Sequence, residues 1–172
     1  DPSCYCSSTT VPEETLSRYL GAVDESGRYY RWTYASTREA LTKLIRTRTA
    51  ATDAAMIQDI RYGARGPSGR LISAEVHFQR NDGSRASITL PNQYSIRRSL
   101  HDSFLLSSAF FHEWKSRSVS PNPQDVIEFS GAGWGHGVGM CQIGALGMAL
   151  SGFDGASILA HYFPRCKVQR VY

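Results

Sequence analysis

Residues 131–142 read GAGWGHGVGMCQ, with a glycine at every second position from Gly131 to Gly139. Glycine has no Cβ, so it adopts positive φ freely and lets another backbone or a ligand come close. It also loses the most conformational freedom on folding, so this run of glycines is costly unless close approach is needed. The segment before the loop, 125–130, predicts a strand, and the segment after it, 140–151, predicts a helix. This order presents backbone N–H groups at a helix N-terminus.

Two nucleotide-binding motifs share features with the loop, and neither fits. Gly133-Trp-Gly-His-Gly137 contains G-x-G-x-G, but the dinucleotide fingerprint needs G-x-G-x-x-G and a ribose-binding acid in a βαβ unit. A phosphate loop needs a lysine followed by serine or threonine, and this stretch contains neither pair. The loop therefore does not predict a nucleotide site.

Residues 126–164 resemble the C-terminal signature of the SpoIID family, the sporulation stage II protein D group with the amidase enhancer LytB. That signature runs roughly G-x-G-W-G-H-G-V-G-M-S-Q-W-G-A, followed by an alanine- and glycine-rich helix and I-L-x-x-Y-Y-P. Cys141 stands where the family usually has Ser, and Ile143 where it usually has Trp. A looser likeness extends back to about residue 16, through Tyr30-Arg31-Trp32.

The resemblance implies a function at the bacterial cell wall. SpoIID-like proteins remodel peptidoglycan outside the cytoplasm, and the sporulation protein is a lytic transglycosylase that acts on glycan strands without stem peptides. The implied function is this kind of peptidoglycan remodelling, at an extracytoplasmic location, secreted or membrane-anchored and facing the wall. The alternative is a non-catalytic peptidoglycan-binding or amidase-activating module like LytB. The implied partners are glycan strands and a cell-wall amidase or another wall-remodelling protein.

No catalytic residue is assigned within the chain, so whether it is an enzyme stays open. The family's catalytic glutamate lies in an EMP…EALKAQAVAARTYA segment that has no counterpart here, and we expect that acid upstream of Asp1. The carboxylates of Glu75, Glu113 and Glu128 lie on predicted strands, where a solvent-facing role is ordinary. We expect a single SpoIID-like domain over 1–172 without the catalytic segment, and membrane attachment only through a missing N-terminal anchor.

The substrate-binding candidates are Trp134, Gly135, His136, Gly137 and Gln142. Trp134 is either a core anchor or a flat surface for a sugar ring. His136 is either a buried imidazole bonded to backbone carbonyls or a substrate-contacting acid or base. Gln142 can bind a sugar hydroxyl, an N-acetyl group or the loop backbone. A thiol hydrolase built on His136 and Cys141 is a minor alternative, because the resembling family has Ser there without that chemistry.

Four cysteines permit disulfides in an exported protein: Cys4, Cys6, Cys141 and Cys166. Cys141 and Cys166 are the candidate disulfide, which would tie the C-terminal end to the glycine loop. Cys4 and Cys6 are the candidate metal ligands, because the resembling sporulation enzymes bind zinc through Cys and His near here. No His precedes His77, so a local loop or disulfide is the alternative. The function requires no cofactor, and structural zinc is the one candidate.

Composition and patterning predict an α+β fold. The chain has 172 residues, 41% hydrophobic content and net charge +4, which suits one globular domain. No apolar run is long enough for a transmembrane helix. The basic residues are scattered, so no nucleic-acid partner is expected. We expect a mostly antiparallel sheet with about five packed helices, as in a SpoIID-like fold, and a cleft where the glycine loop meets the strands of 57–90.

Individual elements follow from local signals. Alternation over 70–80, a turn at 81–84 and a return strand over 85–90 predict a three-stranded antiparallel meander within 57–90. Ser36 and Glu39 form a capping box for a helix, whose basic residues Arg38, Lys43, Arg46 and Arg48 predict a solvated face. Further strands are predicted over 104–114 and 167–172. A last helix, capped by Asp154, is predicted over 155–163, and the small residues of the helix over 140–151 predict close packing on a sheet.

Overall fold

The computed structural model describes residues 4–21, 27–116, 118 and 120–169, without the side chains of 27 and 28. The chain divides into two compact units. We call Tyr29–His136 the sheet unit, and Asp1–Arg28 together with Gly137–Tyr172 the helical unit. Each is described by itself. The single domain expected over 1–172 stays a prediction, because a compact unit need not fold independently.

Helices and strands follow one another along the described chain in the order η1 (Glu13–Thr15), α1 (Leu16–Leu20), α2 (Gly27–Tyr30), β1 (Arg31–Thr37), α3 (Arg38–Arg48), β2 (Ala54–Tyr62), β3 (Ala74–Arg80), β4 (Arg85–Leu90), α4 (Gln93–Ser99), β5 (Phe110–Trp114), β6 (Val126–Ala132), α5 (Gln142–Leu150) and α6 (Gly155–Tyr162). None of the helices described is both long enough and apolar enough to cross a membrane.

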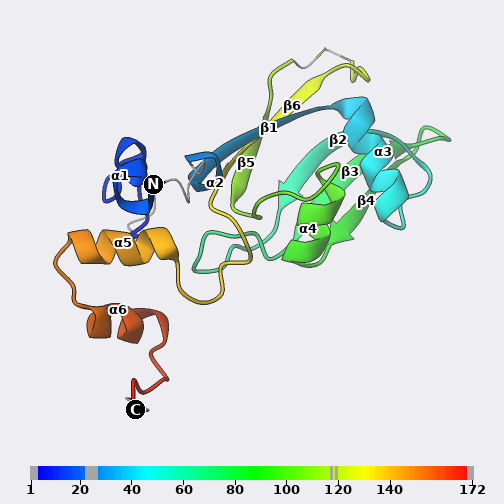
Figure 1. Cartoon of the computed structure of the whole chain (residues 1–172). Coiled ribbons are helices and arrows are strands. Elements are labelled where there is room, and N and C mark those ends of the chain that lie inside the picture. Colours follow the sequence, from blue (N-terminus) through cyan, green and yellow to red (C-terminus); the bar gives the residue numbers. More distant parts are fainter. Residues whose placement is uncertain (1–3, 22–26, 117, 119, 170–172) are drawn as a thin grey trace. The chain divides into compact units, whose positions relative to one another are not determined.

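The strands of the sheet unit form two three-stranded antiparallel sheets (Figure 1). One has the order β1-β6-β5, and the other has the order β2-β3-β4. The second sheet is the meander predicted within 57–90. Helices and antiparallel sheets therefore combine as expected, and the α+β fold class is confirmed.

The meander forms because its hydrophobic residues alternate with the period of a strand. On β3, Ala74, Val76 and Phe78 are buried, whereas the residues between them face outward. Fully buried residues of α3, Leu41 and Ile45, belong to the same core cluster. This cluster unites side chains of both sheets with side chains of α3 and α4.

Two predicted element boundaries are wrong, each because a non-local bond competes. Thr37, not Ser36, caps α3 by accepting a hydrogen bond from the Ala40 N–H at 3.1 Å. The Glu39 N–H, which a cap at Ser36 would bind, donates instead to the Pro123 carbonyl at 3.0 Å. The strand predicted over 104–114 begins only at Phe110. The backbone of 105–108 bonds instead with Arg97 on α4 and with Leu71.

The C-terminal predictions have mixed outcomes. Asp154 caps α6 as predicted, accepting from the Ser157 N–H at 2.8 Å. Of the closing strand predicted over 167–172, residues 167–169 are irregular and 170–172 lie outside the described residues.

Arg38 is buried rather than solvated, which corrects the predicted basic face. Its side chain is 1% exposed and that of its partner Asp125 is 3% exposed. The Arg38 Nε and Nη2 atoms donate to Asp125 Oδ2 at 3.2 and 3.0 Å, and the guanidinium lies 3.9 Å from the centre of the Trp114 ring. The pair therefore joins α3 to the start of β6 beneath an aromatic ring.

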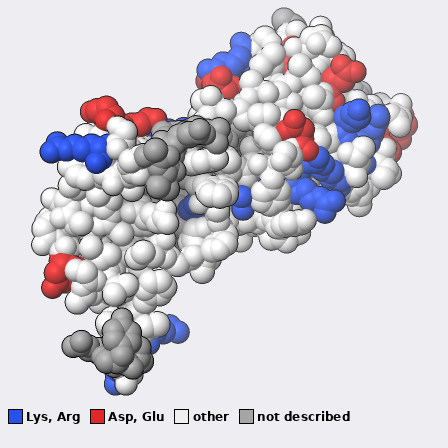
Figure 2. Space-filling view, in the orientation of Figure 1, with Lys and Arg blue, Asp and Glu red and all other residues white. Residues whose placement is uncertain are grey.

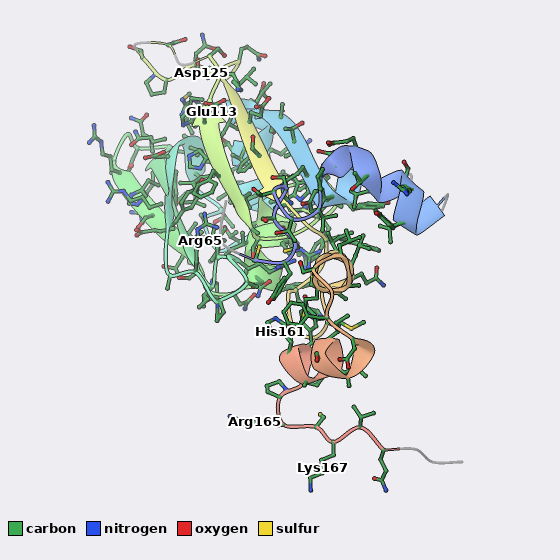
Figure 3. The ribbon with its side chains drawn as sticks, turned by 90° about the vertical axis from the view of Figure 1, so that its left-hand side faces the viewer. Arg65, Glu113, Asp125, His161, Arg165 and Lys167 are labelled. Atoms are coloured by element: carbon green, nitrogen blue, oxygen red, sulfur yellow. The ribbon has the colours of Figure 1, made fainter. Side chains whose placement is uncertain are left out.

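Further hydrogen bonds satisfy the Asp125 carboxylate. The Asn122 N–H donates to it at 3.0 Å, and Ser118 donates both its N–H and its hydroxyl. The Asn122 bond first, then those of Ser118 and Arg38, hold the pKa of Asp125 well below its usual range, although desolvation opposes them. Figure 3 shows Asp125 at the same end of the β5–β6 pair as Glu113.

In the helical unit, glycines of α5 allow close approach, but of a different partner than predicted. A Cβ at Gly147 would lie 1.9 Å from the Tyr5 carbonyl oxygen, and a Cβ at Gly144 would lie 2.1 Å from the Tyr162 hydroxyl. These glycines therefore pack against the N-terminal segment and α6 rather than against a sheet. Val11 and Met148 are buried in this unit.

The buried ion pair predicts an acid-sensitive stability. The unfolded-state pKa of Asp is about 3.9, and folding lowers it for Asp125. The stabilisation is therefore complete above about pH 4 and is lost as the pH falls through the folded-state pKa. We expect Asp125→Asn to unfold at lower urea concentration than the wild type at pH 7, with the difference shrinking toward pH 2. Glu14→Gln, at an exposed position, is the control. A difference that is constant with pH would contradict the assignment.

Candidate functional site

The backbone of the glycine loop has the conformation that its sequence predicts. Gly133, Gly135, Gly137 and Gly139 have φ values of 69°, 89°, 73° and 99°. L-residues with side chains rarely adopt this region, so glycine is required at these positions. Gly131 serves the other expected purpose, which is close approach.

Trp32 occupies the space beside Gly131. A Cβ on residue 131 would lie 2.0 Å from an atom of the Trp32 ring, which is itself 8% exposed. The indole Nε1–H of Trp32 donates to the Gly133 carbonyl at 3.0 Å. The buried tryptophan thus fixes where the loop leaves β6.

The Gly133 and Gly135 amides of the loop are already bonded to protein carbonyls. The Gly133 N–H donates to the Tyr30 carbonyl at 2.9 Å, and the Gly135 N–H donates to the Leu106 carbonyl at 2.8 Å. The Gly135 carbonyl accepts from Arg70 Nε at 2.9 Å. In the helical unit, Cys141 caps α5, its Sγ accepting from the Gly144 N–H at 3.3 Å. Of the amides expected to be exposed at the helix N-terminus, that of Gly144 is therefore bonded to a side chain.

Trp134 points to solvent and stacks on a second aromatic residue. Its side chain is 68% exposed, which excludes the role of a core anchor. Its ring lies 5.2 Å from that of Tyr29, at an interplanar angle of 22°. We call this pair the aromatic platform. Because one face of the indole rests on the phenol ring, the platform is a braced flat surface.

The other predicted site residues are divided between the two units. His136 is exposed, so it is not a buried structural imidazole. Trp134, Gly135 and His136 end the sheet unit, and the structure brings these three together. Gly137 and Gln142 belong to the helical unit, where Gln142 is the exposed first residue of α5.

Sequence reasoning missed two contributors to this site, Tyr29 and Arg70. Tyr29 supports Trp134 although the two lie far apart in sequence, and Arg70 holds the Gly135 carbonyl from the loop before β3. Aromatic enrichment around residues 29–32 was the available signal for Tyr29. No local signal pointed to Arg70, because its partner is a backbone oxygen.

The carboxylates considered as catalytic acids are all bonded to neighbours. Glu75 accepts from the Ser87 hydroxyl at 2.6 Å and lies 3.0 Å from His77 Nε2. The Ser87 bond is the largest cause that lowers the pKa of Glu75. Glu113 and Glu128 pair across β5 and β6, and both bind Lys115. A general acid needs a raised pKa, and the environment of Glu75 does the reverse.

The cysteines are arranged differently from the predicted pairing. Cys166 is an exposed free thiol, so the predicted Cys141–Cys166 disulfide is not formed in the structure. The side chain that hydrogen-bonds Cys141 is that of Cys6. Within the described ranges, no group of three or more His, Cys, Asp or Glu side chains is arranged to hold a metal ion. Structural zinc at Cys4 and Cys6 stays a prediction.

Two hollows in the surface of the sheet unit lie away from the glycine loop. One is lined by residues that include Arg48, Leu90, Tyr94 and Arg98. The other is lined by residues that include Glu39, Lys43, Arg46 and Met56. Neither matches the cleft expected where the loop meets the meander. The candidate site in the sheet unit is therefore the exposed aromatic platform with His136.

Two comparisons with known proteins bear on the chain. A scan against protein-family models matches residues 3–139 to Domain of unknown function (DUF8618). The match covers most of the chain and ends within the glycine loop. A search of curated proteins finds no match.

Close packing on Trp32 predicts a steric effect at Gly131. We expect Gly131→Ala to lower the free energy of unfolding by about 1–3 kcal/mol, because the buried indole cannot yield to a methyl group. Gly66→Ala is the control, since a Cβ there meets nothing closer than the Arg70 carbonyl oxygen at 4.0 Å. Urea unfolding followed by tryptophan fluorescence measures both. Equal effects of the two variants would refute the steric account.

Proposed function

Because the chain belongs to the family Domain of unknown function (DUF8618), we propose a function from its own residues: it binds the glycan strands of peptidoglycan in cell-wall remodelling. The observation that carries the proposal is the exposed aromatic platform, within a loop whose sequence resembles the SpoIID signature. The location that goes with this function is extracytoplasmic, either secreted or anchored, facing the wall.

The platform has the chemistry needed to hold a sugar ring. Pyranose rings present C–H groups on their faces, and an indole provides a flat apolar surface against which such a face packs. Tyr29 braces Trp134, so little side-chain freedom is lost when a ligand binds. His136 is exposed next to it, separated only by Gly135. An imidazole can donate to or accept from the hydroxyl groups at the edge of a sugar.

The surface charge is compatible with a largely uncharged polymer. On the face drawn in Figure 2, Lys and Arg are interspersed with Asp and Glu over the sheet unit. A nucleic-acid site usually gathers basic side chains into one patch or stripe. We therefore propose glycan rather than nucleic acid as the polymer bound.

The proposed activity is that of a lytic transglycosylase acting on strands without stem peptides. This reaction needs one carboxylic acid, which protonates the leaving oxygen and then acts as a base while the sugar's own hydroxyl attacks C1. The proposal assigns that acid to none of Glu75, Glu113 and Glu128, because all three are held by other side chains. No step requires a metal.

A non-catalytic module is the second candidate. It is favoured because the carboxylates of Glu75, Glu113 and Glu128 are bound to other side chains. In that case the chain would bind glycan and activate a cell-wall amidase or assist another remodelling protein. Binding through the platform is common to both candidates, whereas glycan cleavage belongs only to the first.

The platform predicts which side chains govern glycan affinity. We expect Trp134→Ala to weaken binding of stem-peptide-free glycan strands about tenfold, corresponding to roughly 1.4 kcal/mol. Tyr29→Ala should weaken it less, because it removes the support and leaves the indole. Phe111→Ala is a matched control, since Phe111 is 67% exposed on the same unit and Trp134 is 68% exposed. Isothermal titration measures all three, and equal losses in the Trp134 and Phe111 variants would refute the platform.

Product analysis separates the two candidate functions. Purified glycan strands are incubated with the chain, and the products are analysed by mass spectrometry. An anhydro-muramic product that forms more slowly with the Trp134→Ala variant than with the wild type supports the transglycosylase. Binding without any product, together with faster cleavage by an added amidase, supports the activating module. Absence of binding to glycan rejects both.

A further inference from the structure

A cluster of three thiols lies in the helical unit, apart from the aromatic platform. Cys4 Sγ and Cys6 Sγ are 3.4 Å apart. The side chain of Cys6 also hydrogen-bonds that of Cys141, and this contact is the largest cause that raises the pKa of the Cys6 thiol. Cys6 therefore contacts Cys4, which is close to it in sequence, and Cys141, which follows the whole of Tyr29–His136 in the chain.

Packing that does not involve sulfur holds the segment around Cys6 against α5 and α6. The backbone of Tyr5 rests on α5 at Gly147, where any side chain would clash. The Tyr5 ring also meets the edges of Phe153 and His161, each with ring centres 5.5 Å away; Figure 3 shows His161 on α6. The residue next to Tyr5 is therefore held beside α5, whose N-cap is Cys141.

We propose that Cys6 and Cys141 are the site of a disulfide that covalently joins the N-terminal segment to the start of α5. Formation removes one proton and one electron from each thiol. The oxidant is a disulfide compound such as oxidised glutathione. One cysteine thiolate attacks it, which forms a mixed disulfide and releases one thiolate of the oxidant. The second cysteine thiolate then displaces the other thiolate, and the two released thiolates take up the two protons. One S–S bond is formed in the chain and one is broken in the oxidant.

The other pairings are less favourable. A Cys4–Cys6 bond would close a ring around a single residue, which strains the preferred disulfide geometry and restricts the unfolded chain very little. None of the four cysteines is in a disulfide in the structure. The thiol contacts that involve Cys141 and Cys6 connect them with each other and with Cys4, whereas Cys166 lies beyond α6. A Cys6–Cys141 bond instead closes a loop that contains all of Tyr29–His136 in sequence, and long loops give the greatest restriction of the unfolded state.

The test is a disulfide map of the full chain. The protein is equilibrated with oxidised and reduced glutathione, alkylated in denaturant without reduction, digested and analysed by mass spectrometry. We expect one linked pair of peptides, containing Cys6 and Cys141, and alkylation of only Cys4 and Cys166. Reduction should lower Tm by on the order of 10 °C. A Cys4–Cys6 or Cys141–Cys166 link, four alkylated thiols, or zinc bound in equal amount to the chain would overturn the proposal.

Three variants make the map specific. Cys166→Ser should leave the linked peptides and Tm unchanged, because Cys166 takes no part. Cys6→Ser and Cys141→Ser should each abolish the link and make Tm insensitive to reduction. A reduction-sensitive Tm in the Cys141→Ser variant would contradict the assignment. The result is independent of glycan binding, so it stands or fails separately from the proposed function.

Discussion

The indole of Trp32 fills the space that a side chain on residue 131 would need, and this constraint determines how the glycine loop leaves the sheet. Trp32 and Gly131 are also opposite each other in the β1–β6 register. Because Trp32 donates to the Gly133 carbonyl, the chain turns at a fixed point. The next residue, Trp134, then lies outside the core and against Tyr29. The absence of a Cβ at Gly131 therefore lets Trp32 pack against the loop, and this packing positions the aromatic platform outside the core.

The opposite end of β6 is fixed by charge. Asp125 precedes the strand and binds Arg38 at the start of α3. Burial of an ion pair costs desolvation energy, which is offset only when the remaining lone pairs and protons are hydrogen-bonded. Asn122 and Ser118 provide those bonds to the carboxylate. The strand that carries the glycine loop is thus held at one end by a satisfied ion pair and at the other by close packing.

Local patterns predicted the parts of this structure that depend on local physics. Alternation of hydrophobic and polar residues predicted β3, and the spacing of the glycines predicted positive φ in the loop. The capping residue Asp154 predicted where α6 begins. Non-local partners decided the rest. Arg38 sits at a position that helical periodicity would leave in solvent, but a carboxylate 87 residues away accepts its hydrogen bonds. Within the candidate site, Trp134 was identified from its motif, whereas Tyr29 could be found only once the fold placed it there.

The hydrogen bonding of the loop also limits what this site can recognise. Backbone amides at a helix N-terminus or a glycine loop bind anions when they are unoccupied. Here the Gly133 and Gly135 amides donate to protein carbonyls, and Arg70 binds the Gly135 carbonyl. A phosphate would have to break these bonds before it could use the amides. An aromatic face requires no such exchange, since it binds by contact and by release of water. In this loop the exposed aromatic platform, rather than the Gly133 and Gly135 amides, is therefore the surface open to a ligand.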